Sequence, residues 1–241
     1  MSKIVLLFLV LAFHQLSFAQ SLYDQEGALI RSDTLKKEIY LCLTGHDYFE
    51  GFKEVLGVLA QNEVQASFFL TGGFIRNHQS LTQKIDRQGH FVGAHSDKHL
   101  LYCDWNRRDS LLHSEAEIKQ DILNNLSELN ALKIYPDYFM PPYEWYNKQV
   151  VKIARELGQI TVNFSPGTRS NSDYTTPDMP NYLDSDTILK SIYDREDQSG
   201  LQGFHLLIHP GTSPLRKDKL YHHLDELIQE LKNRGYSFRR F

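Results

Sequence analysis

The amino-acid sequence predicts an α/β fold in which helices cover a mostly parallel sheet. Short apolar runs alternate about seven times with stretches that carry apolar residues at a spacing of three to four. The apolar runs are continuous, which is typical of strands that are buried on both faces of a parallel sheet. With 241 residues, the chain can bury one full hydrophobic core. A barrel and an open doubly wound sheet both fit this pattern.

The expected strands are short apolar runs, and the expected helices lie between them. Three glycines, Gly89, Gly158 and Gly235, each end a helical stretch and directly precede the next strand. The strands are expected at 39–43, 66–70, 90–94, 138–140, 160–164, 204–208 and 236–238. The helices are expected at 51–61, 81–88, 114–132, 148–157, 185–193 and 220–234.

One connection breaks this rhythm. Residues 165–182 read SPGTRSNSDYTTPDMPNY, which is too long and polar for a simple turn. We expect a surface loop over the functional site. The sequence shows no internal repeat and no second domain.

The N-terminal segment has the pattern of a signal peptide. Lys3 precedes an unbroken apolar run at 4–13, and Ser17 and Ala19 supply small residues for cleavage. We expect cleavage after Ala19, with an uncleaved anchor as the alternative, and export to the periplasm or the outside of the cell. The expected organisation is therefore a signal peptide at 1–19, a lead-in at 20–36 and one domain at 37–241.

Charge and cysteine content restrict the partners. The chain has 26 Lys and Arg against 30 Asp and Glu, a net charge of −4, so we expect no nucleic-acid partner. We also expect no membrane partner after signal cleavage, and the sequence does not indicate the oligomeric state. Export would permit a disulfide between Cys42 and Cys103, but Cys42 lies in an apolar run and also fits as a small core residue.

Polar motifs follow four of the expected strands. They are residues 44–47 (TGHD), 95–99 (HSDKH), 141–143 (PPY) and 209–211 (HPG). Because the carboxyl ends of parallel strands meet at one end of a sheet, these motifs should converge there. The sequence therefore predicts a functional site at that end.

One carboxylate and two imidazoles in these motifs are suitable ligands for a divalent metal. Asp47, His95 and His99 offer the oxygen and nitrogen atoms that Zn²⁺ takes in catalytic sites. The two histidines would share a face if the chain turned helical after its strand. The alternatives are that Asp47 caps the helix beginning near Gly51, and that the histidines are ordinary surface or core residues.

Taken together, the motifs resemble the polysaccharide deacetylases, the NodB-homology group of carbohydrate esterase family four. The resemblance runs from about residue 37 to 241 and looks closest to a Bacteroidetes-type branch with stretches such as GAHSDKHLLYCDW, PPYEWYN and LLIHPGT. It implies a distorted (β/α) barrel of about seven parallel strands. It also implies a divalent metal, Zn or else Co, Mn or Ni, and the removal of acetyl groups from amino sugars or acetylated polysaccharides.

The resemblance also implies residue roles. Asp47, His95 and His99 match the metal ligands of the family. The backbone N–H of Tyr143 matches the group that stabilises the oxyanion, and His209 matches the group that protonates the departing amine or alcohol.

Three departures affect this comparison. His46 stands where the family has its catalytic aspartate, and Met140 stands where it has the arginine partner. The Asp-Trp pair of the fourth motif is absent, with Asp173 as a candidate substitute. His46 is either a neutral base that accepts a proton from the attacking water or a fourth metal ligand that closes the site.

Aromatic residues beside these motifs suit a glycan, because flat apolar rings pack on the C–H faces of sugars. The predicted substrate-binding residues are Tyr48, Trp105, Pro142, Tyr143, Trp145 and Tyr146.

The sequence therefore predicts an exported metal-dependent hydrolase that removes acetyl groups from an N- or O-acetylated polysaccharide or oligosaccharide. The main alternative is a glycan-binding protein that keeps the barrel and the metal but turns over weakly or not at all. A metal-dependent hydrolase of other amides is a third reading.

Overall fold

A computed structural model describes residues 20–241 of the chain. The expected signal peptide and its cleavage site after Ala19 lie outside the described residues. Within residues 20–241, no helix is both long and apolar enough to cross a membrane.

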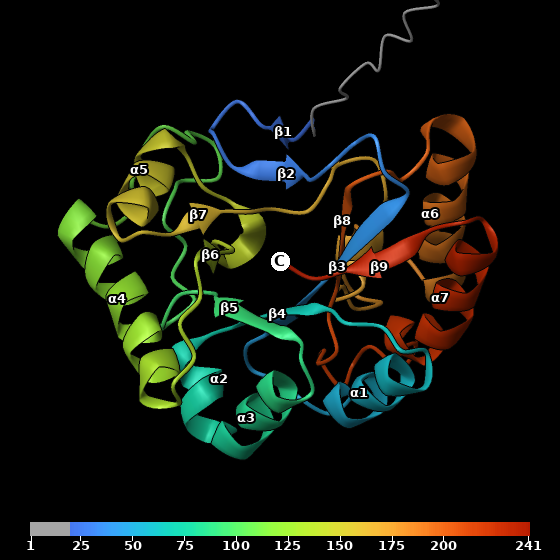
Figure 1. Ribbon diagram of the computed structural model, residues 1–241. Helices are drawn as coiled ribbons and strands as arrows, with labels where there is room; N and C mark the ends of the chain where they lie inside the picture. The colour runs from blue at the N-terminus through green and yellow to red at the C-terminus, as the bar shows by residue number, and fades with distance from the viewer. Residues whose placement is uncertain (1–19) are drawn as a thin grey trace, which may run out of the picture.

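The strands form one curled sheet in the order β1-β2-β8-β3-β4-β5-β6-β7, with β9 paired to β3 (Figure 1). All seven strands expected from the sequence are present, and their pairings with one another are parallel. The expected distorted (β/α) barrel is confirmed. These strands are β3 (Glu38–Gly45), β4 (Ser67–Leu70), β5 (Phe91–Ala94), β6 (Tyr138–Phe139), β7 (Ile160–Thr161), β8 (Phe204–Ile208) and β9 (Ser237–Arg239).

The segment expected as a lead-in adds two further strands, β1 (Leu22–Tyr23) and β2 (Leu29–Arg31). The Asp24 carboxylate accepts hydrogen bonds from three successive N–H groups, at residues 26–28, and so fixes the turn between the two strands. Strand β2 pairs antiparallel with β8, and Leu29 bridges to Val162 just beyond β7. This bridge closes the ring, so the folded unit begins before the expected boundary at residue 37.

Helices surround the outside of the sheet except on the side of β1 and β2 (Figure 1). The six expected helices are present, although residues 220–223 form a separate 3₁₀ turn ahead of α7. The sequence analysis missed α2, a six-residue helix whose N-terminus is capped by the Thr71 side chain. The helices are α1 (Phe52–Gln61), α2 (Gly72–Asn77), α3 (Gln79–Arg87), α4 (Glu115–Ala131), α5 (Lys148–Glu156), α6 (Ser185–Ser199) and α7 (Leu224–Asn233).

The long polar connection after β7 is not simply a surface loop. It contains a short 3₁₀ turn, η2 (Ser170–Ser172), and several of its polar side chains are buried, among them Ser165, Asp173 and Thr175. Their hydrogen bonds explain this burial: the Ser165 hydroxyl accepts from the N–H of His205, and the Thr175 hydroxyl donates to the carbonyl of Ser172.

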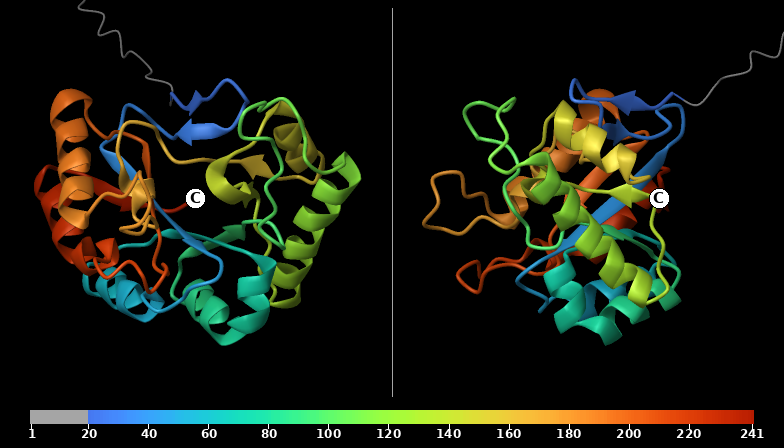
Figure 2. Two further views of the ribbon diagram at one scale, coloured as in Figure 1. Left: turned by 180° about the vertical axis from the view of Figure 1, so that it is seen from behind. Right: turned by 90° about the vertical axis from the view of Figure 1, so that its left-hand side faces the viewer.

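The two ends of the barrel differ. Long loops project from one end, beyond the carboxyl ends of the parallel strands, and the C-terminus lies toward the other end (Figure 2). There the ring of Phe241 lies 4.8 Å from that of Tyr138, 4.9 Å from that of His205 and 5.3 Å from that of Tyr40, measured between centroids. Its N–H donates to the Ser67 hydroxyl. We call these five residues the basal cluster.

The two cysteines are both buried and free. Cys42 packs in the barrel interior with Phe69 and Leu207, which agrees with its reading as a small core residue. Cys103 packs with the other hydrophobic cluster and bridges to Leu111. No disulfide joins them in the structure.

His205 couples the stability of the barrel to pH. Its ring nitrogens bond the carbonyl of Asn163 at 2.8 Å and the hydroxyl of Ser32 at 2.9 Å. Burial lowers the pKa of His205 to about 4 from its ordinary 6.5. Between these values the unfolded chain binds the proton more readily, so stability falls as the pH falls through this window. We expect His205 to account for roughly 3 kcal/mol of the loss.

Urea unfolding of the unaltered protein and His205→Gln at about pH 7 and about pH 4.5 checks this expectation. The variant should lose less stability on acidification than the unaltered protein. Equal losses would show that His205 does not carry the effect.

Candidate active site

Four histidines gather at the loop end of the barrel. His46 follows β3, His95 and His99 follow β5, and His209 follows β8. The rings of His46 and His99 are stacked with centroids 4.3 Å apart, and those of His95 and His99 meet edge to face at 5.0 Å. His209 is close enough for its charge to act on both His95 and His99. Parallel strands thus bring together residues that are far apart in sequence.

His95 is buried and firmly oriented. Its Nδ1 lies 2.8 Å from the carbonyl oxygen of Met140, and its backbone N–H donates to the Asn125 side chain at 2.7 Å. Because a carbonyl only accepts, Nδ1 carries the hydrogen and Nε2 keeps its lone pair. Burial lowers the pKa of His95 to about 3, although the Met140 bond opposes this shift. A neutral imidazole with one nitrogen fixed by a carbonyl is a typical metal ligand.

His99 reaches the site by a bent loop and not by the helical turn that would have put it on one face with His95. Ser96 and His99 both take left-handed backbone conformations, with φ of 69° and 54°. The Ser96 hydroxyl accepts from the N–H of His99, and α4 contributes Asp121, which accepts from the N–H of Lys98. Non-glycine residues in this conformation cost free energy and concentrate at functional sites. Side-chain hydrogen bonds therefore hold a strained loop that presents His99.

Asp47 is the least enclosed of the predicted ligands. Its side chain is 69% exposed, and its Oδ1 lies 3.3 Å from Nε2 of His46. It does not cap the following helix, because the N-cap of α1 is Gly51 and makes no side-chain bond. Burial lowers the pKa of His46, with the nearby Asp47 acting in the opposite direction. His46 is therefore neutral at neutral pH.

The donor atoms suit a divalent cation in part. His95 and His99 are neutral imidazoles whose rings meet, as nitrogen ligands must. However, residues 20–241 contain no group of three or more His, Cys, Asp or Glu side chains arranged to hold a metal ion. Asp47, the third predicted ligand, instead has its carboxylate toward His46 and solvent.

His209 is paired with a buried carboxylate. Asp173 accepts from the His209 backbone N–H at 2.7 Å and contacts the ring Nδ1 at 2.5 Å. Burial lowers the pKa of His209, but Asp173, and to a lesser extent Glu144, raises it overall. Asp173 thus occupies the place of the acidic partner that the fourth motif lacks, as the sequence suggested. The pair is suited to donate a proton through the free Nε2.

The sequence analysis did not select Glu144, the residue after Tyr143. It is half-buried, and burial raises the pKa of its carboxyl to about 7, with His209 opposing and Asp173 adding to the shift. Tyr143 and Glu144 have consecutive left-handed φ values of 59° and 52°. The only available signal was an acidic residue inside PPYEWYN, which does not reveal that its charge acts on His209.

Three of the six predicted substrate-binding residues form one continuous aromatic row. The ring centroid of Tyr143 lies 4.4 Å from that of His99, Trp105 lies 5.8 Å from Tyr143, and Trp145 lies 5.5 Å from Trp105. Trp105 is 54% exposed and Tyr143 45%. The row leads away from the histidines across the surface and offers apolar faces to a ligand.

The other three predicted substrate-binding residues are placed differently. Tyr146 is fully buried, and its hydroxyl donates to Asp24 at 2.7 Å, so it is a packing residue and the prediction of substrate contact is wrong. Pro142 is also buried, within the turn η1 (Pro142–Glu144) that presents Tyr143. Tyr48 is exposed and lies beside Asp47, in a groove also lined by Phe49.

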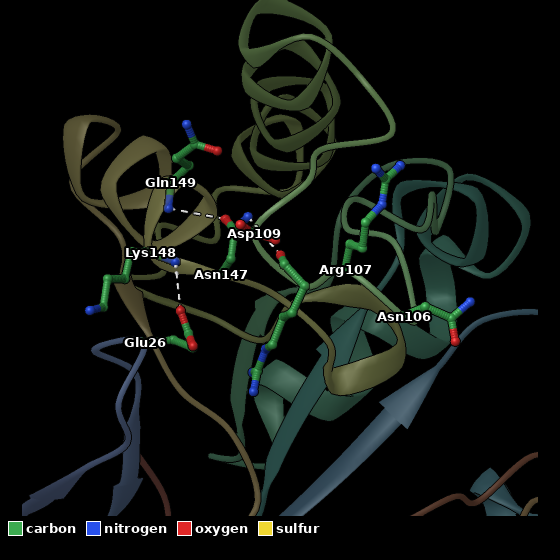
Figure 3. Close-up of a pocket in the computed structure, with 8 residues that line it drawn as sticks. Glu26, Asn106, Arg107, Asp109, Asn147, Lys148 and Gln149 are labelled. Carbon is green, nitrogen blue, oxygen red and sulfur yellow. Dashed lines mark hydrogen bonds between the residues drawn. The ribbon is translucent and has the colours of Figure 1, made fainter.

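A separate polar hollow lies next to the aromatic row (Figure 3). The guanidinium of Arg108 connects the two, since it lies 4.3 Å from the ring centroid of Trp145. The hollow has a volume of about 650 Å³ and includes none of the four histidines. It is lined by Glu26, Asn106, Arg107, Arg108, Asp109, Asn147, Lys148 and Gln149.

Comparison with known proteins gives a consistent result. A family model described as polysaccharide deacetylase matches residues 31–162. The chain is 28% identical over 194 residues to the uncharacterized protein YlxY of Bacillus subtilis, covering 80% of this chain but only about half (51%) of that relative. It is 27% identical over 224 residues to the peptidoglycan-N-acetylmuramic acid deacetylase PdaA of the same organism, covering 91% of this chain and 75% of PdaA.

Among solved structures, the chain is similar to a carbohydrate esterase family 4 pseudoenzyme from Bacillus anthracis. The TM-score is 0.72 at 23% identity, covering 89% of this chain and 67% of that one. At this identity the likeness concerns the fold.

Proposed function

Because the chain belongs to the polysaccharide deacetylase family, the NodB-homology group of carbohydrate esterase family 4, we propose that it removes acetyl groups from an acetylated glycan. The single observation that carries this proposal is the group of His46, His95, His99 and the His209–Asp173 pair at one end of the barrel. Supporting it, the relative PdaA is named for the deacetylation of peptidoglycan.

The proposed substrate is an N- or O-acetylated polysaccharide or oligosaccharide outside the cytoplasm. The aromatic row supports a sugar, since Tyr143 exposes its ring beside His99 and the exposed ring of Trp105 lies next to Tyr143. We propose export through the N-terminal apolar segment, with cleavage after Ala19. Assignment to the Bacteroidetes-type branch stays a prediction.

We propose Asp47, His95 and His99 as the residues that would hold a divalent cation, with Zn as the first candidate and Co, Mn or Ni as the others. When bound, such a cation polarises the acetyl carbonyl as a Lewis acid. Among the residues of the chain, His95 is best prepared for this role, because the Met140 carbonyl fixes its ring.

Other residues of the site would carry out proton transfer and stabilise the oxyanion. The raised pKa of His209 favours its protonated form, which can give a proton to the departing nitrogen or oxygen. The proposed role of the Tyr143 backbone N–H is to stabilise the oxyanion. His46 keeps the two roles that the sequence suggests. It is neutral and partly exposed, as a proton acceptor must be, while its stack on His99 also suits a further ligand beside the proposed ones.

A second candidate function is glycan binding without efficient turnover. Two observations favour it. Position 46 carries a histidine in place of the family's aspartate, and position 140 carries a methionine in place of its arginine. A protein described as a pseudoenzyme also has a similar fold. In that case the protein would bind acetylated glycans but release no acetate.

Acetate release tests the proposed function. The purified protein with Zn²⁺, Co²⁺ or Mn²⁺ is expected to release acetate from N-acetylated oligosaccharides, peptidoglycan or O-acetylated polysaccharides. EDTA should abolish the release, and added metal should restore it, because the cation polarises the carbonyl. An enzyme assay for free acetate gives the measurement.

Three other outcomes would each contradict a different part of this proposal. Release that EDTA leaves unchanged would contradict the metal role. Saturable glycan binding with no acetate after hours would favour the binding protein. Acetate from simple amides but not from glycans would favour a hydrolase of other amides.

A further inference from the structure

The site contains one acidic residue that the proposed function leaves without a role. The family position for the catalytic carboxylate is occupied by His46, and Asp173 is engaged with His209 through both of its oxygens. Asp47 is the proposed cation ligand. Asp97 is paired with Arg76, which leaves Glu144, whose charge acts on His209.

Glu144 lies in an unusual turn beside the site, directly after the residue whose ring contacts His99. Two proline residues precede it, and the N–H of Glu144 donates to the carbonyl of Pro141 at 3.1 Å. The carbonyl of Glu144 accepts from the Asn163 side chain at 3.2 Å, which ties the turn to the chain beyond β7. Two consecutive left-handed residues, Tyr143 and Glu144, persist only where the surroundings enforce them. The turn therefore places the Tyr143 ring against His99, and the charge of the adjacent Glu144 acts on His209.

The Glu144 carboxylate is available for chemistry. Among residues 20–241, no hydrogen bond engages its two oxygens, in contrast to the carboxylates of Asp121 and Asp173. The charged groups that face it are His209, at the end of β8, and Asp173, in the connection after β7. Burial is the largest cause that raises its pKa, to about 7. A half-buried carboxyl that gains and loses a proton near neutral pH has the properties of a general base.

We infer that Glu144 is the proton acceptor for the attacking water and so supplies, from the turn after β6, the carboxylate that position 46 lacks. This inference rests on the proposed deacetylase function. The water oxygen forms a bond to the acetyl carbon while its proton passes to the Glu144 carboxylate. The bond from that carbon to nitrogen or oxygen then breaks, and the leaving atom takes a proton from His209. Acetate departs, Glu144 gives its proton to solvent, and His209 takes one back. His46 then takes the other role that the sequence suggests for it, that of a fourth metal ligand beside His95 and His99.

Glu144→Gln tests this inference with little change of shape. It should lower kcat for acetate release at least about 100-fold with little change in KM, as loss of a general base does. It should bind Zn²⁺ with the same stoichiometry as the unaltered protein, which separates a base from a ligand. The acidic limb of kcat/KM that the unaltered protein shows should be absent from the residual activity.

Glu63→Gln is the matched control. Glu63 also has a left-handed backbone, with φ of 54°, but is exposed after α1 at the other end of the barrel. The Glu63→Gln variant should be as active as the unaltered protein.

Glu144→Gly provides a second variant in case the amide disturbs folding, since glycine suits a φ of 52°. Added formate should restore a measurable part of its activity by replacing the missing carboxylate, and should do nothing for Glu63→Gly.

The outcomes decide between the proposals. Acetate release by the unaltered protein that Glu144→Gln retains within about threefold would overturn this inference alone. The inference would also be overturned if the acidic limb of kcat/KM disappeared in His46→Asn but remained in Glu144→Gln, because His46 would then be the base. No acetate release by the unaltered protein would overturn the proposed function and this inference with it.

Discussion

Replacing His95 by Gln is expected to lower kcat/KM for acetate release at least about 1,000-fold, equivalent to roughly 4 kcal/mol of transition-state stabilisation. His95 is buried, and its Nδ1 is fixed by the Met140 carbonyl, so Nε2 is the atom aimed into the site. Glutamine can bond the same carbonyl but offers a poor amide ligand in place of an imidazole. Zn²⁺ affinity, measured by competition with a chelating dye, should fall together with the activity.

His90→Gln is the appropriate control for that experiment. His90 is also buried, stands just before the same strand at its opposite end, and accepts from the N–H of Ala66. Burial lowers its pKa to about 4. This variant should keep both its Zn²⁺ affinity and its kcat/KM. If His95→Gln retained activity and metal, the assignment of the ligands would fail.

Asp173→Asn should have an effect of similar size, on a different step. The Asp173 carboxylate accepts from both the N–H and the Nδ1 of His209 and raises the pKa of that imidazole against the effect of burial. An amide can accept only through its oxygen, and its nitrogen would face a donor. We expect kcat to fall about 1,000-fold, by analogy with the aspartate that orients a catalytic histidine in serine proteases.

The role of His209 as an acid fixes the direction in which the pH profile of Asp173→Asn should move. His209 must be protonated to act as an acid, so activity is lost as the pH rises through its pKa. Without Asp173 this pKa falls, and the alkaline limb of kcat should move to lower pH. Asp178→Asn is the control, because Asp178 lies in the same connection but is exposed and, among residues 20–241, its side chain bonds only the Thr176 hydroxyl. An unmoved alkaline limb in Asp173→Asn would show that His209 is not the acid.

The sequence pattern was sufficient for a mostly parallel sheet and for the group of histidines, for a physical reason, and the family resemblance selected the barrel. Parallel strands buried on both faces produce continuous apolar runs, and each run ends where its motif begins. The position of His46, His95 and His209 at one end of the sheet follows from that pattern alone.

What the sequence could not show depends on irregular backbone. Asp173 could be offered only as a candidate, because its link to His209 spans 36 residues through a connection without helical or strand periodicity. Glu144 enters the site only because two consecutive residues adopt left-handed conformations after Pro142. Strands β1 and β2 are too short, at two and three residues, to produce an apolar run. Tyr146 was assigned to substrate contact because the sequence of the motif does not show whether an aromatic side chain faces a ligand or the core.

The basal cluster around Phe241 lies at the opposite end of the barrel from the histidines. In parallel barrels that end governs durability, whereas chemistry belongs to the loop end. Engineers seeking a longer-lived catalyst can therefore randomise Tyr40, Tyr138 and Phe241 together, and screen for heat tolerance without reselecting for turnover.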